Sequence, residues 1–176
     1  MQCTIPEEMI KIVDKDNNVI GKATRKQMRS MNLFHRNAHI FLYNLHHSFY
    51  IQKRSALKDY CPGWFSLAVG GVIEYDEDEM SGALRELKEE MGVEMKNIKF
   101  HGILPFESRI GDDNNRGFSY IYSGQYDGPI VKQDEEVAEV LLWSADEIEE
   151  KMKIAIFANI VPDSIEAYKK IAITKI

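Results

Sequence analysis

The residues best suited to chemistry are three glutamates near the middle of the chain, Glu86, Glu89 and Glu90. Residues three or four positions apart share one face of a helix, so these carboxylates can converge. Like charges about 4 Å apart repel by about 1 kcal/mol in water and about 4 kcal/mol at an effective dielectric of about 20. A divalent cation would relieve this repulsion, and oxygen ligands favour Mg²⁺ or Mn²⁺ over zinc. On charge alone, an exposed acidic helix is an equal alternative.

The helix that must carry these acids is predicted to start near Asp78 as its N-cap and to end at Gly92. Its apolar residues recur at helical spacing, which predicts one buried stripe. The stripe consists of Met80, Ala83, Leu84, Leu87 and Met91. We therefore expect the glutamates to point away from the side that docks on the domain, and Lys88 to point elsewhere.

Arg85 lies on the acidic side of this helix and can pair with Glu89 or reach back to Glu77. A surface ion pair of this kind is worth at most about 1 kcal/mol. We favour a role in organising the acidic loop, because Arg85 is the cation on that side.

The spacing of these residues resembles the Nudix box. Gly71 is followed after five residues by Glu77, and after seven more by the run from Arg85 to Val93, Arg-Glu-Leu-Lys-Glu-Glu-Met-Gly-Val. Every defined position of the box is filled. The resemblance implies an α/β/α sandwich, a strand–loop–helix motif, and metal-dependent attack of water on a diphosphate, usually of a nucleoside diphosphate linked to another group.

By this resemblance, Glu86, Glu89 and Glu90 hold the metals and the Gly70 carbonyl is a further ligand, while Glu77 and Arg85 brace the loop and helix. Many family members take a general base from a later loop. The candidates are Asp134, Glu135, Glu136 and Glu139. Of these we favour Glu136, with Glu90 as the alternative base; for any single one of the later acids, a solvated loop residue is the more common interpretation.

The N-terminal two-thirds is also similar to isopentenyl diphosphate isomerase, a Nudix relative that moves a proton. The similarity covers the early hairpin, Leu33 to Arg36, and Arg54 to Lys58 followed by Pro62-Gly63. It implies that Arg54 and Lys58 contact a diphosphate, with Arg36 as a further candidate, although Arg54 and Lys58 can equally be solvated.

The same comparison argues against isomerase chemistry. The reactive cysteine would fall at Gly70, and two metal-binding histidines would fall at Met28 and Val72. Only His35 remains, and a lone histidine is more often structural. Hydrolysis is therefore the favoured reaction; an isomerase-like activity and a nucleotide-binding domain without catalysis are the alternatives.

The remaining pattern predicts one mixed α/β (α+β) domain over residues 1–176, with a hairpin and helix extension at 1–32 and the box at 70–93. The sequence predicts polar loops at 54–63 and 107–115. The predicted strands are Met9–Val13, Val19–Lys22, Ala38–Tyr43, Phe49–Lys53, Trp64–Val69, Ile98–Pro105, Gly117–Ser123 and Val137–Trp143. The predicted helices are Thr24–Met31, the box helix, one from Ser144 to about Met152, and one from Pro162.

The amino-acid composition indicates the class of protein and its expected partners. The chain has 176 residues, of which 44% are hydrophobic and 28% charged, as in globular proteins. A net charge of −6 makes nucleic acid an unlikely partner and leaves a small-molecule diphosphate as the expected one. We expect no secretory signal or membrane span, and two cysteines without metal spacing favour the cytoplasm. A homodimer is compatible with these features.

Overall fold

The computed structural model describes residues 7–110, 113–154 and 159–174. Its strands are β1 (Met9–Val13), β2 (Val19–Thr24), β3 (His35–Tyr43), β4 (Phe49–Arg54), β5 (Phe65–Ser66), β6 (Lys99–Ile110), β7 (Asp113–Gln125) and β8 (Val137–Trp143). Its helices are α1 (Arg25–Ser30), α2 (Glu79–Met91), α3 (Ala145–Met152) and α5 (Pro162–Thr174).

Strand β3 organises the sheet. It pairs in parallel with β7 along its whole length, from His35 opposite Gly117 to Tyr43 opposite Gln125. Strand β6 extends this part by antiparallel pairing with β7, whereas β4 pairs antiparallel with β8 and β5. The β1–β2 hairpin joins the start of β3 through Ile12. The sheet is therefore mixed, as predicted.

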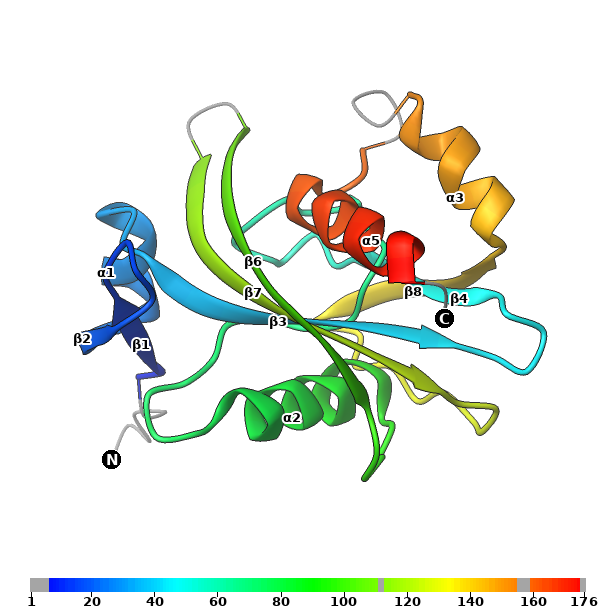
Figure 1. The fold of residues 1–176 in the computed structure, drawn as a ribbon, viewed down its shortest axis with the longest axis horizontal. Coiled ribbons are helices and arrows are strands. Elements are labelled where there is room, and N and C mark those ends of the chain that lie inside the picture. Colours follow the sequence, from blue (N-terminus) through cyan, green and yellow to red (C-terminus); the bar gives the residue numbers. More distant parts are fainter. Residues whose placement is uncertain (1–6, 111–112, 155–158, 175–176) are drawn as a thin grey trace.

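Helices cover both faces of the strands (Figure 1), with α2 on one side and α5 on the other. Side chains alternate along β3, so that Ile40 and Leu42 pack with Leu87 of α2, while Phe41 packs with Tyr168 of α5. Two buried clusters result, one under each helix layer. This arrangement confirms the predicted α/β/α sandwich.

Two stretches differ from the sequence prediction. The predicted strand Trp64–Val69 is reduced to the two residues of β5, because Val69 makes only an isolated bridge to Ile40. The predicted loop at 107–115 is largely strand, since Glu107 to Ile110 pair across to β7 in an unbroken register. Long-range pairing here overrides the turn-forming composition of the segment.

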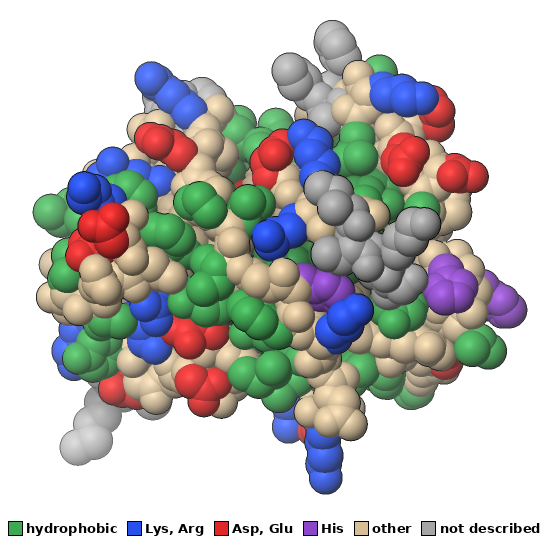
Figure 2. All heavy atoms as spheres, viewed as in Figure 1, with side chains coloured by type: hydrophobic (Ala, Val, Ile, Leu, Met, Phe, Trp, Pro, Cys, Tyr) green, Lys and Arg blue, Asp and Glu red, His purple; other side chains and the backbone are tan. Residues whose placement is uncertain are grey.

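The surface charge bears on nucleic acid as a partner, and the length of the helices bears on a membrane. In Figure 2, Lys and Arg side chains are interspersed with Asp and Glu over the face shown, and no broad basic patch covers it. Among the helices in the described part of the chain, none is long and apolar enough to cross a membrane.

Candidate active site

Helix α2 forms where its end signals predict. The Asp78 carboxylate accepts a hydrogen bond from the Ser81 N–H at 2.8 Å, and Gly92 closes the helix with a left-handed φ of 64°. Ala83, Leu87 and Met91 are fully buried, which docks the helix on the sheet. The box helix is therefore fixed at both ends and along one side.

The three box glutamates differ in exposure. Glu86 and Glu90 are 7% and 1% exposed, whereas the Glu89 side chain is 49% exposed. Burial and then the charge of Glu90 raise the pKa of Glu86 to about 8. Lys88 lies apart from these acids and pairs with Glu94 at 2.6 Å, as predicted. Two of the acids thus form a buried pair whose full ionisation needs a nearby positive charge.

The glycine turn before the loop is shaped by this acid pair. The Gly70 N–H donates to Glu90 Oε2 at 3.1 Å. A Cβ on Gly70, whose φ is 143°, would lie 2.1 Å from the Ala38 carbonyl oxygen, and a Cβ on Gly71 would lie 2.6 Å from the Glu86 carboxylate. Glycine is required at Gly70 because the β3 backbone approaches it closely, whereas a side chain at Gly71 would push the Glu86 carboxylate aside.

Arg85 and Glu77 tie the loop to the helix. Arg85 Nη2 and Nε donate to the two oxygens of Glu77 at 2.7 and 3.0 Å, and Nη1 donates to Glu86 and Glu89 at 2.9 Å each. Burial alone would lower the pKa of Arg85, but Glu77 and Glu86 raise it above its usual value. Both partners considered from the sequence, Glu77 and Glu89, are therefore engaged at once.

Lys58 and Glu136 reach the acid pair from two other loops. Lys58 Nζ lies 3.4 Å from Glu90 Oε1 and forms a hydrogen bond with Glu136. The loops themselves are joined by a hydrogen bond of 3.0 Å from the Ser55 N–H to the Glu136 carbonyl. The structure thus brings together one residue expected to contact substrate and one expected to act as a base.

These groups line a pocket of about 270 Å³. Its lining includes Glu86, Glu89, Glu90, Arg85, Lys58, Glu136 and Gly71. Glu8, Arg25 and Gln133 also line it but carried no recognisable signal in the sequence. Sequence reasoning also missed Gln52, which is 1% exposed and donates to Glu90 Oε2 at 2.7 Å; its position directly after Phe49, Tyr50 and Ile51 was the available clue.

Two predicted substrate residues lie elsewhere. Arg54 donates from Nε to the Tyr60 carbonyl at 3.0 Å and lines a neighbouring chamber. Arg36 pairs with Glu79 at 2.6 Å and donates to Asn17 at 2.8 Å. It links the β1–β2 turn to the start of α2 and does not line the acid pocket, because its side chain leaves β3 on the face opposite to Asn37.

The side chains that line the pocket suit a hard divalent cation as a ligand, because they offer carboxylate oxygens. Two of these carboxylates belong to the buried side chains of Glu86 and Glu90. Within the described residues, no three His, Cys, Asp or Glu side chains are grouped as the ligands of one ion. Lys58 and Arg85 instead pair with these carboxylates. A metal ion would therefore have to exchange with the Lys58 ammonium.

Comparison with known proteins identifies the family. The family model described as NUDIX domain matches residues 33–163. YfcD of Escherichia coli K12, named as an uncharacterized Nudix hydrolase, is 33% identical over 160 residues, covering 91% of this chain and 84% of that protein. PA4841 of Pseudomonas aeruginosa, named likewise, is 28% identical and covers 92% of both.

Solved structures agree on the fold. DR0079 from Deinococcus radiodurans has a TM-score of 0.71 at 19% identity, covering 92% of this chain and 98% of that one. The NUDIX domain of NrtR from Shewanella oneidensis, solved with ADP ribose, has a TM-score of 0.60 at 17% identity, covering 77% and 84%. The chain belongs to the Nudix hydrolase family, a family of pyrophosphohydrolases.

Proposed function

We propose that the protein hydrolyses the diphosphate bond of a nucleoside diphosphate linked to another group, or of a similar organic pyrophosphate, in a reaction that depends on Mg²⁺ or Mn²⁺. The observation that carries this proposal is the acid pocket of about 270 Å³, where buried Glu86 and Glu90 lie beside Lys58 and Glu136. A small-molecule diphosphate is the proposed partner, and the cytoplasm is the proposed location.

Glu86, Glu89 and Glu90, together with the Gly70 carbonyl, would hold the cation. When bound, such a cation neutralises the diphosphate and lowers the pKa of a coordinated water. The burial of Glu86 and Glu90 supports this assignment, because a divalent cation would offset the desolvation and the Glu90 charge that raise the pKa of Glu86 even with Arg85 and Lys58 beside the pair.

The chain's own residues supply the other requirements. Glu136 is the proposed general base, with Glu90 as the alternative. The water oxygen bonds to one phosphorus, the bridging phosphorus–oxygen bond breaks, the water proton passes to the base, and two phosphate products leave. Lys58, which lines the pocket, is the proposed donor to diphosphate oxygens as negative charge develops. Arg85 and Glu77 act as positioning residues for the loop and helix.

The geometry of Gly70 favours hydrolysis over the isomerase alternative. The isomerase-like comparison needs a cysteine side chain at this position, yet a Cβ there would lie 2.1 Å from the Ala38 carbonyl oxygen. The backbone leaves no room for a nucleophile or acid at this point, whereas the carboxylates needed for hydrolysis line the pocket.

The test is a phosphate-release screen of diphosphate substrates, ADP ribose among them, with Mg²⁺ and with Mn²⁺. We expect turnover of at least one diphosphate and loss of turnover on removing the metal. Glu90→Gln should abolish release while circular dichroism shows a retained fold. Full activity in Glu90→Gln, or tight binding without turnover across the panel, would overturn the proposal.

A further inference from the structure

Gln52 places a polar side chain in the interior of the sheet. It lies on β4, opposite Ser66 of β5 on one side and Val140 of β8 on the other, and it is 1% exposed. Burying an amide is costly unless the amide is hydrogen-bonded. Its Nε2 donates to Glu90 Oε2 at 2.7 Å. Gln52 therefore ties the middle of the sheet to one of the proposed metal ligands.

The two oxygens of the Glu90 carboxylate have different surroundings. Oε2 accepts from Gln52 and also from the Gly70 N–H, at 2.7 and 3.1 Å. A carboxylate oxygen has two lone pairs, so these two donors can occupy both. Oε1 lies 3.4 Å from the Lys58 ammonium, which lines the acid pocket. Oε1 is therefore the oxygen of Glu90 that remains for a cation in this pocket.

The donors to Oε2 can stay in place when a cation enters, whereas Lys58 cannot. A cation repels the Lys58 ammonium, but the amide of Gln52 and the main-chain N–H of Gly70 carry no net charge. Gln52 belongs to a strand that is paired on both sides. Exchange of the lysine for a metal should therefore leave both hydrogen bonds to Oε2 intact.

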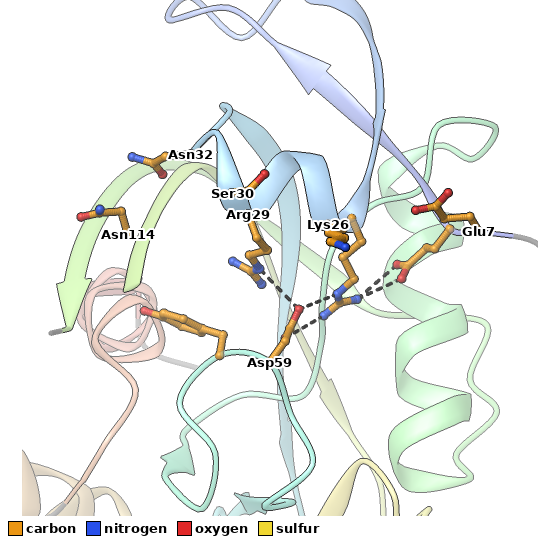
Figure 3. Close-up of a pocket in the computed structure, with 10 residues that line it drawn as sticks. Glu7, Lys26, Arg29, Ser30, Asn32, Asp59 and Asn114 are labelled. Atoms are coloured by element: carbon orange, nitrogen blue, oxygen red, sulfur yellow. Dashed lines mark hydrogen bonds and ion pairs between the residues drawn. The ribbon is translucent and has the colours of Figure 1, made fainter. Parts of the chain in front are cut away.

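The loop that carries Lys58 is itself held on the Oε1 side of the carboxylate. Arg25 and Arg29 of α1 both pair with the neighbouring Asp59, at 2.9 and 3.5 Å. Figure 3 shows Arg29 directed from α1 toward Asp59, in a pocket of about 780 Å³. Because this loop is fixed to α1, Lys58 approaches Glu90 from a defined direction, and the two carboxylate oxygens keep different roles.

Divalent cations differ in how they use a carboxylate. Ca²⁺ takes a larger and more flexible set of oxygens and can bind a carboxylate through both of its oxygens. Mg²⁺ is smaller and requires near-ideal octahedral geometry, and Mn²⁺ also suits octahedral oxygen sites. A glutamate that offers a single oxygen fits the octahedral ions and withholds the second oxygen that Ca²⁺ can use.

We propose that Gln52 is a positioning residue that, together with the Gly70 N–H, restricts Glu90 to binding through Oε1 and so favours Mg²⁺ and Mn²⁺ over Ca²⁺. The inference rests on the proposed function for the place of the cation. Gln52 is not among the described residues that line the acid pocket, so it acts on the cation through Glu90.

Competition between Mn²⁺ and Ca²⁺ on the full chain, without substrate, tests the inference. Free Mn²⁺ is followed by electron paramagnetic resonance at pH 7.5, first alone and then against increasing Ca²⁺. Gln52→Met removes the donor at similar volume and leaves Oε2 with one hydrogen bond. We expect wild type to prefer Mn²⁺, and the ratio of the Ca²⁺ to the Mn²⁺ dissociation constant to fall about tenfold or more in the variant.

Ser66→Ala is the matched control, since Ser66 is 6% exposed and lies opposite Gln52, but its hydroxyl donates to the Ala68 carbonyl. It should leave the ratio unchanged. Circular dichroism checks the fold of each variant. Should Gln52→Met fail to fold, Gln52→Asn keeps an amide but shortens its reach by one methylene, and it should lower the ratio in the same direction.

The ratio separates positioning from packing, because a general loosening of the site weakens both ions alike. Equal losses of Mn²⁺ and Ca²⁺ affinity in the Gln52 variant, or an equal fall of the ratio in Ser66→Ala, would overturn the role of Gln52 and leave the proposed function standing. A wild-type protein that binds no Mn²⁺ would overturn the cation site of the proposed function and this inference with it.

Discussion

Replacing Lys58 by methionine should strengthen metal binding, although it removes a side chain from the proposed active site. The Lys58 ammonium lies 3.4 Å from Glu90 Oε1, is hydrogen-bonded to Glu136, and belongs to a side chain only 11% exposed. A divalent cation held by Glu90 would be repelled by this ammonium, so the lysine must leave its partners when the metal enters.

The size of the effect follows from the contact that is broken. A hydrogen bond between charged groups contributes about 1.5–3 kcal/mol. Wild-type protein loses this contribution when a metal binds, whereas Lys58→Met has none to lose. The variant should therefore bind Mn²⁺ about 10- to 150-fold more tightly. Binding of methylenediphosphonate should become weaker in the same variant, because the methionine side chain has no N–H group to donate to the diphosphate.

Free Mn²⁺ can be followed by electron paramagnetic resonance during titration at pH 7.5 without substrate. Lys88→Met is the matched control, since Lys88 is on α2 but its side chain is 65% exposed and pairs with Glu94. Circular dichroism checks the fold of both variants. An unchanged or weaker Mn²⁺ affinity in Lys58→Met would refute the exchange between ammonium and metal.

Two further predictions concern buried groups. Gly71→Ala should weaken Mn²⁺ binding and lower the free energy of unfolding in urea by about 1–3 kcal/mol, because the new Cβ would lie 2.6 Å from the Glu86 carboxylate. Gly21→Ala is the control, since a Cβ at Gly21 would have no heavy atom within 4 Å. Equal effects of the two substitutions would contradict the reasoning. The pKa of His35 is lowered to about 4 by burial, so its contribution to stability is present above pH 6.5 and is lost as the pH falls toward 4. When the pH is lowered from 7.5 to 5.5, the free energy of unfolding measured in urea should therefore fall by about 1.4 kcal/mol more in the wild type than in His35→Gln. Equal decreases in the two proteins would show that the histidine does not titrate as described.

Local signals made the box helix predictable. The Asp78 cap, the Gly92 stop and the spacing of Ala83, Leu87 and Met91 depend only on neighbours in sequence, and all are present in α2. Ser144 likewise forms its capping box with Glu147. Such features can be read from a single chain because the interacting groups lie within one or two turns of each other.

Contacts between distant segments were not predictable in the same way. The pairing of Lys58 with both Glu90 and Glu136 joins three segments, and nothing in their local sequence specifies it. Gln52 reaches Glu90 only because β4 lies beside the box helix. Arg36 was selected as a substrate contact by the isomerase similarity, but the sequence does not reveal that β3 directs its side chain toward Glu79.

The isomerase-like similarity remains a prediction about ancestry, and the relatives named above are called Nudix hydrolases. The isomerase comparison expects a cysteine at Gly70, and the clash of a Cβ there with the Ala38 carbonyl could be recognised only from the packing of β3 against the turn. The sequence shows that a glycine occupies position 70, but it does not show that the Ala38 carbonyl leaves no room for a side chain there.

The most direct test of the central claim is hydrolysis of the diphosphate panel in ¹⁸O-labelled water with Mg²⁺, read by mass spectrometry of the products. The proposed mechanism predicts that each cleavage places one solvent oxygen on a phosphate product, and that Glu90→Gln lowers the rate at least about 100-fold. Label-free products, or proton exchange at carbon of isopentenyl diphosphate with no cleavage of any diphosphate, would contradict it.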